Sequence, residues 1–236
     1  MEHTVSVRDG MFTTRVFVEG EGKPLLFLHG IGGMQGSAPF LEGLARHFQV
    51  YAPWHPGYGA SEGIDHIDDV IDLAFYYHDL LDALQLENPH IVGHSIGGMI
   101  GAEVAALCPH AVDKLILVAP MGLWLDQHPV ADFCSITREE LTQAIWHDPE
   151  SPIAKEMTPV PTTPEEELRL NLERAQAFST SGKFLWPIPD KGLKKRIHRI
   201  KASTLLIWGE SDRLVPPVYG EEFLKRIKRA RLTILK

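Results

Sequence analysis

The strongest chemical signal in the sequence is a serine flanked by glycines. Residues 93–98 read Gly-His-Ser-Ile-Gly-Gly, between a β-rich run and a helical pattern. A serine hydroxyl is a weak nucleophile unless a sharp turn holds it exposed beside a base, and nearby glycines let the backbones at such a turn pass closely. The pattern predicts that Ser95 is a nucleophile on a strained strand-to-helix turn. A phosphate-binding turn is the weaker alternative, because no lysine follows as in a P-loop.

A second glycine-rich segment could stabilise charge during acyl transfer. Residues 29–33 read His-Gly-Ile-Gly-Gly and follow the apolar run 24–28. Acyl transfer develops an oxyanion that needs preorganised N–H donors. We expect one donor from the backbone of Ile31 and the other from that of Ile96, where the positive end of the following helix helps. His29 is expected to be structural and to hydrogen-bond the loop.

A carboxylate occurs just past a later strand. Residues 208–216 read Trp-Gly-Glu-Ser-Asp-Arg-Leu-Val-Pro, and Asp212 is expected to orient a catalytic histidine and stabilise it as imidazolium. Glu210 is the second candidate. An Asx turn before Pro216 is the structural alternative. The chain order of serine, then aspartate, with a histidine expected third, favours the catalytic interpretation.

The elements that must position these residues alternate between strand and helix. Helical patterns occur at residues 37–47, 66–86, 96–107 and 217–229. Eight β-rich runs occur at residues 4–7, 14–18, 24–28, 49–53, 90–93, 114–119, 203–208 and 231–235. Parallel strands need crossover connections, and two of these runs are continuously apolar, as strands buried on both faces are. The sequence therefore predicts an α/β fold with a mostly parallel eight-stranded sheet and helices on both faces.

One long segment interrupts this alternation. It holds eight of the 17 prolines and two helix starts with capping-box spacing, Thr137 with Glu140 and Thr163 with Glu166. A helical insertion is expected here. The chain is thus expected to consist of a first part of the core, the insertion and a second part of the core, at residues 1–120, 121–190 and 191–236.

Together these segments resemble the α/β-hydrolase fold family over essentially the whole chain. The matching segments, in the family's order, are residues 29–30, 56–61, 93–98 and 209–212. The resemblance implies a serine hydrolase that needs no cofactor and has a helical lid, here residues 121–190. Within the family the chain looks most like carboxylesterases, enol-lactonases and carbon–carbon bond hydrolases. The last group usually has asparagine before the nucleophile and Gly-Pro-Gly-Ala in the oxyanion loop, where this chain has His94 and residues 31–33.

The chain departs from the family pattern in its histidines. His55 stands where the family often has aspartate, and the catalytic histidine that should follow the last strand is missing, because only Lys236 follows it and His198 is the last histidine. We therefore expect a C-terminally shortened chain with a nearly unreactive serine and an exposed apolar patch, or a partner, on one sheet face. His55 and His128 could approach the site, and His94 should point away beneath the turn.

The expected reaction is hydrolysis of an ester or related acyl bond through an acyl-enzyme. The apolar stretch 122–125 favours a small to medium, largely apolar substrate. Two alternatives keep the fold: a carbon–carbon bond hydrolase or lyase, and a catalytically impaired protein that only binds small molecules. Labelling by a fluorophosphonate separates catalysis from binding, because rapid labelling needs an activated serine.

Composition narrows the remaining possibilities. A chain of 236 residues with 44% hydrophobic and 23% charged residues can bury a sizeable core, which excludes disorder. The net charge is −8, and the cations of the basic segment 191–236 fit the solvated face of a helix better than a nucleic-acid site. The 12 histidines show no ligand-like spacing, so no metal is expected.

The same survey suggests where the protein acts. Cys108 and Cys134 are too few for a disulfide framework, which favours a reducing compartment. The N-terminus lacks the pattern of a secretory leader, and no run of 18 apolar residues occurs. We expect a cytoplasmic protein that acts on a small molecule, with no nucleic-acid or membrane partner. The oligomeric state stays open.

Overall fold

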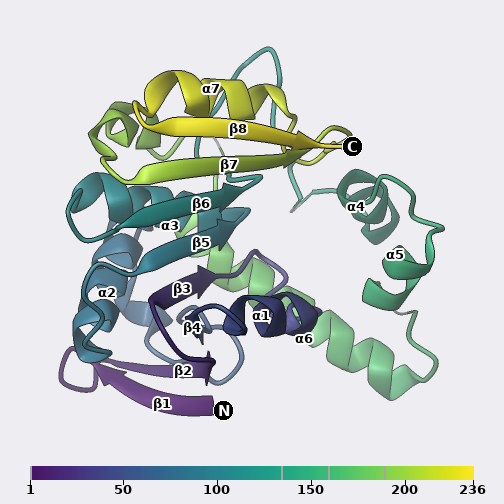
Figure 1. Ribbon diagram of the computed structural model, residues 1–236. Coiled ribbons are helices and arrows are strands. Elements are labelled where there is room, and N and C mark those ends of the chain that lie inside the picture. The colour runs from purple at the N-terminus through teal and green to yellow at the C-terminus, as the bar shows by residue number, and fades with distance from the viewer. Residues whose placement is uncertain (1, 134, 159, 189) are drawn as a thin grey trace.

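A single sheet organises the molecule, as Figure 1 shows for the computed structural model, which describes residues 2–133, 135–158, 160–188 and 190–236. Cys134 therefore lies outside the described residues. The strands run in the order β1-β2-β4-β3-β5-β6-β7-β8, antiparallel from β1 through β2 to β4 and parallel elsewhere. Their bounds are Glu2–Val7, Phe12–Glu19, Pro24–Leu28, Gln49–Pro53, His90–His94, Lys114–Val118, Ser203–Gly209 and Ala230–Leu235 for β1 to β8. The predicted eight-stranded, mostly parallel sheet is confirmed.

Four helices connect the strands of the core: α1 (Ala38–Ala45), α2 (Val70–Ala83), α3 (Ile96–Leu107) and α7 (Val218–Arg226). Three short 3-10 turns add Ile64–His66, Leu193–Lys195 and Ile197–Arg199. The helix predicted over 66–86 begins later, because the Asp69 carboxylate accepts hydrogen bonds from the N–H groups of Ile71 and Asp72 and so caps α2.

The insertion between β6 and β7 contains α4 (Arg138–Ile145), α5 (Pro152–Met157) and α6 (Pro164–Leu185). Thr137 and Glu140 form the predicted capping box at α4. Thr163 also accepts a hydrogen bond from the N–H of Glu166, but the Glu166 carboxylate accepts from Thr162 instead. In Figure 1 the three helices face the carboxyl ends of the parallel strands, which is where an α/β sheet presents its functional loops.

The two faces of the sheet are covered unequally. Helices α2, α3 and α7 share the larger hydrophobic core with one face, whereas α1 contributes Leu41 to a small core on the other. Beyond α1 this second face continues as an apolar stripe on β6, β7 and β8 whose side chains are only partly buried or exposed: Ile116, Val118, Leu205, Ile207 and Leu235. An exposed apolar patch on one sheet face is what the sequence predicts.

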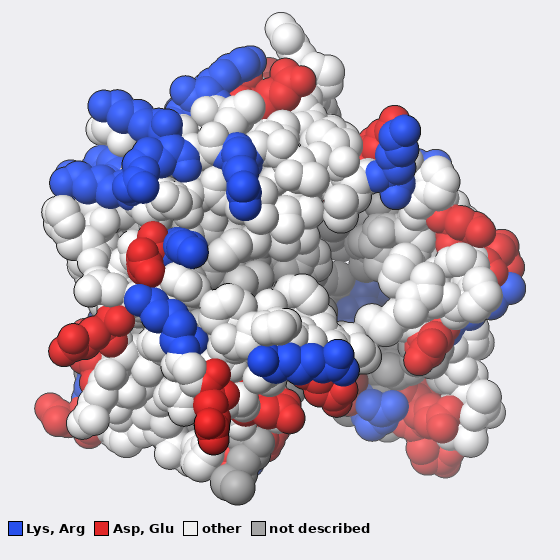
Figure 2. Space-filling model, in the orientation of Figure 1, with Lys and Arg blue, Asp and Glu red and all other residues white. Residues whose placement is uncertain are grey.

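Basic side chains gather near the start of β7 and β8 in Figure 2. On α7, Phe223 is buried, as is Ile227 directly after the helix, while Lys225 and Arg226 pair with Glu222 on the outer face. The cations are therefore the solvated side of an amphipathic helix, although Leu224 is also exposed. Across the described part of the chain, no helix is long and apolar enough to cross a bilayer.

A buried ion pair ties the second part of the core to α3. The Arg196 guanidinium donates to both carboxylate oxygens of Glu103, over 2.8 and 2.6 Å. The Glu103 side chain is 0% exposed. Burial raises the pKa of Glu103, and the hydrogen bonds from Arg196 oppose that rise.

Breaking this pair is expected to destabilise the fold. Arg196→Met leaves the Glu103 carboxylate buried without its partner and should lower the free energy of unfolding by about 3–5 kcal/mol. Urea unfolding measures the loss. Arg169→Met is the matched control, because the Arg169–Glu173 pair is exposed and should be worth less than about 1 kcal/mol. Equal losses in the two variants would contradict the prediction.

Candidate active site

Ser95 occupies the sharp turn between β5 and α3. Its backbone angles are φ 54° and ψ −116°, so the strained conformation predicted from the sequence is present. The Ser95 N–H donates to the Val118 carbonyl over 2.9 Å, and the Ser95 carbonyl accepts from the N–H groups of Met99 and Met121, each over 3.1 Å. These bonds fix the turn to the neighbouring strand and helix.

Two glycines allow the turn to pack closely. A Cβ on Gly93 would lie 2.4 Å from the Gly97 carbonyl oxygen, and a Cβ on Gly97 would lie 2.1 Å from the Leu28 carbonyl oxygen. Real Cβ atoms do not approach backbone oxygens so closely. The glycines in the motif are therefore required for α3 to start against β3.

Gly97→Ala should consequently be costly. The added methyl group meets backbone that cannot move without displacing β3, so we expect the free energy of unfolding to fall by about 3 kcal/mol. The control is Gly182→Ala within α6, where an added Cβ meets nothing within 4 Å. That variant should gain about 0.5–1 kcal/mol from helix propensity. Urea unfolding measures the free energy of unfolding of both variants, and an unchanged value for Gly97→Ala would contradict the prediction.

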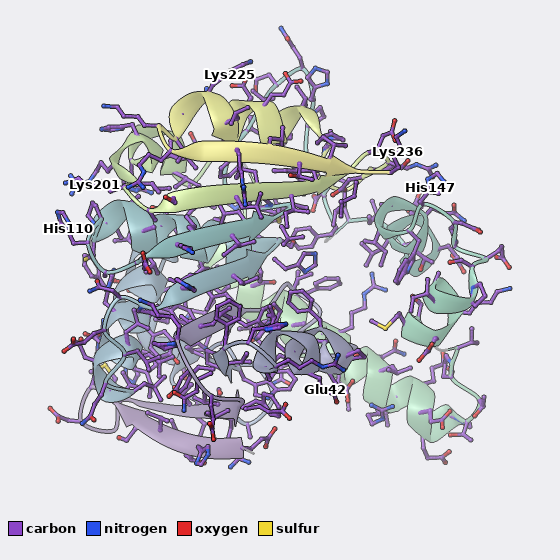
Figure 3. The ribbon with its side chains drawn as sticks, in the orientation of Figure 1. Glu42, His110, His147, Lys201, Lys225 and Lys236 are labelled. Atoms are coloured by element: carbon purple, nitrogen blue, oxygen red, sulfur yellow. The ribbon has the colours of Figure 1, made fainter. Side chains whose placement is uncertain are left out.

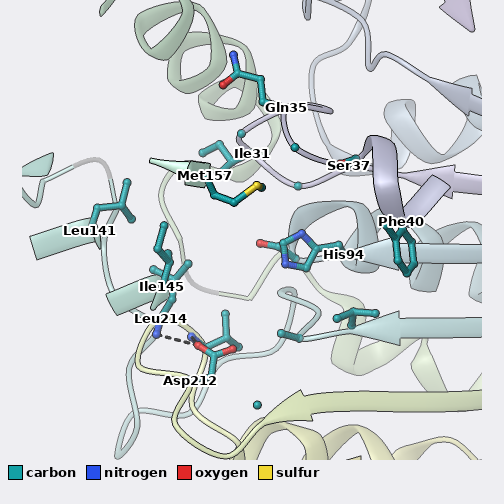
Figure 4. A pocket seen from close by; sticks show the side chains of 18 of the residues that line it. Ile31, Gln35, Ser37, Phe40, His94, Leu141, Ile145, Met157, Asp212 and Leu214 are labelled. Carbon is teal, nitrogen blue, oxygen red and sulfur yellow. Dashed lines mark hydrogen bonds between the residues drawn. The ribbon is translucent and has the colours of Figure 1, made fainter. Parts of the chain in front are cut away.

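Ser95 opens into a cavity of about 750 Å³, which Figure 4 shows from close by. The cavity lies between the core and the insertion, where Figure 2 shows a hollow. Apolar side chains dominate its wall, from the core and from the inserted helices: Phe27, Phe40, Val92, Phe133, Leu141, Ile145, Met157, Phe178, Leu214 and Val215. Among the described residues of the wall, Lys236 is the single lysine or arginine.

The two candidate oxyanion donors flank the serine. Ile31 belongs to the loop that lines the cavity after β3. Ile96 is the first residue of α3, and the N–H groups of a helix's first turn have no acceptor within the helix. The Gly30 carbonyl accepts from the Gly33 N–H over 3.0 Å and hydrogen-bonds the His29 ring over 2.7 Å, which fixes the loop.

Asp212 lines the same cavity as Ser95. Its Oδ1 accepts hydrogen bonds from the N–H groups of Leu214 and Val215, over 3.0 and 2.9 Å. Asp212 therefore forms the Asx turn of the structural alternative and also lines the cavity, as the catalytic interpretation requires. Burial raises the pKa of the Asp212 carboxyl, against the lowering effect of those two bonds. Glu210 also lines the cavity but is exposed.

Two histidines line the cavity that the sequence did not place there, His94 and His147. His94 does not point away beneath the turn: it lines the cavity, because it shares a face of the sheet with Val92, two residues earlier, and with its strand partner Val118, which both line the cavity. Desolvation by the surrounding protein lowers the His94 pKa. His147, which follows α4, also lines the cavity (Figure 3). No sequence motif distinguishes His147, so sequence reasoning missed it.

The other histidines lie elsewhere. His55 is fully buried behind the loop of residues 29–33, and His128 is exposed and does not line the cavity. Within the described ranges, no histidine is hydrogen-bonded to the Asp212 carboxylate or to the Ser95 hydroxyl. The same residues contain no group of three or more His, Cys, Asp or Glu side chains that could hold a metal ion.

Comparisons with known proteins agree with this architecture. Residues 23–146 match the family model described as the alpha/beta hydrolase fold. A 2-hydroxy-6-oxo-6-phenylhexa-2,4-dienoate hydrolase of Comamonas testosteroni is 28% identical over 91% of this chain and 80% of its own length.

Solved structures share the fold at lower identity. A meta-cleavage product hydrolase of Pseudomonas fluorescens IP01 superposes with a TM-score of 0.75 at 20% identity, covering 99% of this chain and 88% of that protein. Naproxen esterase of Bacillus subtilis gives 0.77 at 17% identity, covering 100% and 83%. Since the family model spans more than half of the sequence, and the sheet and strand-to-helix turn agree with it, the chain belongs to the alpha/beta hydrolase fold family.

Proposed function

We propose that the protein is a serine hydrolase that cleaves an ester or related acyl bond of a small to medium, largely apolar substrate. The observation that carries this proposal is the strained Ser95 turn, open to a cavity of about 750 Å³ that Asp212 and the loop containing Ile31 also line. The inserted helices 121–190 act as its lid. In this proposal the core segments 1–120 and 191–236 form the catalytic body.

The reaction proceeds through an acyl-enzyme. The Ser95 hydroxyl oxygen attacks the substrate carbonyl while its proton passes to an imidazole base, which in the assays below is added to the buffer, and the N–H groups of Ile31 and Ile96 stabilise the oxyanion that forms. Collapse of the intermediate expels the leaving group, which takes up the proton. Water then attacks the acyl-enzyme in the same way and releases the acid and free Ser95. Asp212 orients the base and stabilises its charged form.

The chemistry of the wall supports an apolar, uncharged substrate. Apolar side chains bury the acyl group, while the two carboxylates of Glu210 and Asp212 disfavour an anionic one, with Lys236 as the single lysine or arginine among the described wall residues. His94 and His147 add polar contacts that can orient the bond to be cleaved.

Carbon–carbon bond hydrolysis is the second candidate, because a relative that aligns with 91% of the chain is named a 2-hydroxy-6-oxo-6-phenylhexa-2,4-dienoate hydrolase. His94 and residues 31–33 stand where such enzymes usually have other residues, which weakens this candidate. Assays with 2-hydroxy-6-oxo-6-phenylhexa-2,4-dienoate and with short-chain aryl esters decide between the two, since the proposal requires faster turnover of the esters.

Labelling with a fluorophosphonate tests the nucleophile directly. Intact mass should rise by one adduct, and peptide mapping should place the adduct on Ser95. An adduct elsewhere, or none after prolonged incubation with imidazole supplied as a base, would overturn the assignment.

A further inference from the structure

The oxyanion loop rests on a pair of buried histidines. His29 and His55 are both 0% exposed, and their ring centroids lie 3.7 Å apart. Tyr77 of α2, also fully buried, hydrogen-bonds His55 Nδ1 through its hydroxyl. The proposed reaction uses neither the His55 side chain nor the Tyr77 side chain.

A single arrangement of protons satisfies every bond in this cluster. The backbone N–H of His55 donates to His29 Nε2 over 3.1 Å, so that nitrogen must be an acceptor. A neutral His29 then carries its proton on Nδ1 and donates it to the Gly30 carbonyl, 2.7 Å away. His55 Nε2 lies 2.9 Å from the His29 carbonyl and must donate. Its Nδ1 is therefore an acceptor for the Tyr77 hydroxyl.

These bonds determine where the loop's amides point. In a trans peptide the C=O and N–H groups point in opposite directions. The Gly30 carbonyl hydrogen-bonds the His29 ring, so the N–H of the same peptide group, which belongs to the cavity-lining residue Ile31, points away from that buried ring. The His55 ring fixes the preceding peptide group through the His29 carbonyl in the same manner.

We propose that the His29–His55–Tyr77 relay is a positioning device, which holds the Ile31 N–H as an oxyanion donor by fixing the tautomers of two neutral histidines. This inference rests on the proposed function. Its three side chains act through the loop backbone and not on the substrate.

The surroundings keep the relay uncharged. Burial lowers the pKa of His55 to about 4 and holds that of His29 well below its ordinary value, while it raises the pKa of Tyr77, so the hydroxyl keeps its proton. The other titratable groups that face the pair are Tyr58 and, on the His29 side, His94. Helix α6 meets Tyr58 through Ala177 and Ser181, which carry no charge.

Tyr77→Phe tests the relay, with Tyr76→Phe as the matched control. Both tyrosines are fully buried on α2, but the Tyr76 hydroxyl hydrogen-bonds Thr14 over 2.7 Å and does not touch the histidine pair. With imidazole supplied as the base, the maximal rate of fluorophosphonate labelling should fall about ten- to a hundredfold in Tyr77→Phe, with little change in the half-saturating concentration. Tyr76→Phe should keep the wild-type rate within about twofold, since its hydroxyl lies outside the relay.

The pH profile gives a second readout. The Tyr77 hydroxyl bonds the neutral form of His55, and protonation of Nδ1 ends that bond. Removing the hydroxyl therefore makes protonation easier, and the 15N signals of the His55 ring should begin to titrate at higher pH in Tyr77→Phe alone. An unmoved His55 titration, or equal slowing of labelling in the two variants, would overturn the relay.

NMR separates failure of the relay from failure of the proposed function. In wild-type protein with 15N-labelled histidine, one ring should carry its proton on Nδ1 and another on Nε2, and neither of these two should titrate between about pH 5.5 and 8. The Ile31 amide resonance should shift in Tyr77→Phe and not in Tyr76→Phe. Both NMR measurements can be made whether or not Ser95 is reactive, so they test the relay independently of the proposed function. The opposite tautomers, or titration in that range, would contradict the relay even if Ser95 is labelled.

Discussion

Ser95→Ala is expected to abolish fluorophosphonate labelling and to reduce hydrolysis of a short-chain aryl ester by at least about a hundredfold. Alanine keeps the strained turn and the shape of the cavity but removes the oxygen that would carry the acyl group. Losing the nucleophile of a complete triad costs about 10⁶ in rate, and its members act as a unit. The expected loss is smaller here because no described histidine hydrogen-bonds the Ser95 hydroxyl.

The measurement is initial-rate hydrolysis with imidazole in the buffer, corrected for the reaction of imidazole with the ester in solution. Ser211→Ala is the control, because Ser211 lines the same cavity but lies on the loop after β7. It should leave the rate within about threefold, as expected for a side chain outside the reacting groups. Similar losses in both variants would show that Ser95 is not the nucleophile.

Sequence patterns could predict the sheet because its signals are local. Each parallel strand is a short apolar run bounded by turn residues, and the run 25–28 already has the composition of a strand buried on both faces. The Ser95 turn was predictable because its motif is contiguous in the sequence, although the contact that requires a glycine at position 97 is with Leu28, on a strand distant in the chain.

The contacts that the sequence could not predict join residues far apart in the chain. His55 packs against His29 and Tyr77, partners 26 and 22 residues away, and no periodicity in the sequence encodes that meeting. Strand alternation puts His94 on the same face of β5 as Val92, but which face of β5 borders the cavity depends on segments far away in the chain. His147 reaches the cavity wall only because α4 folds back over the core.

Because no described histidine hydrogen-bonds Ser95 or Asp212, we expect added imidazole to activate this chain. Asp212 lines the cavity with Ser95, its carboxylate bonded to backbone N–H groups through Oδ1. A cavity of about 750 Å³ admits imidazole between the two residues. A positioned general base is worth about 10²–10⁴ in rate, and a diffusing one should recover at least about tenfold at 0.1 M.

The pH dependence of this activation follows from the proton that imidazole must accept. Only neutral imidazole is a base, so the activation should grow as pH rises through about 6.5–7. The carboxyl of Asp212 must also be ionised to orient the ring, and because burial raises its pKa the lower boundary lies above that of an ordinary aspartate. Asp212→Asn should weaken the activation, and Ser95→Ala should remove it. Fast turnover without imidazole would instead indicate a base inside the chain, and His94→Gln and His147→Gln would then identify which cavity histidine supplies it.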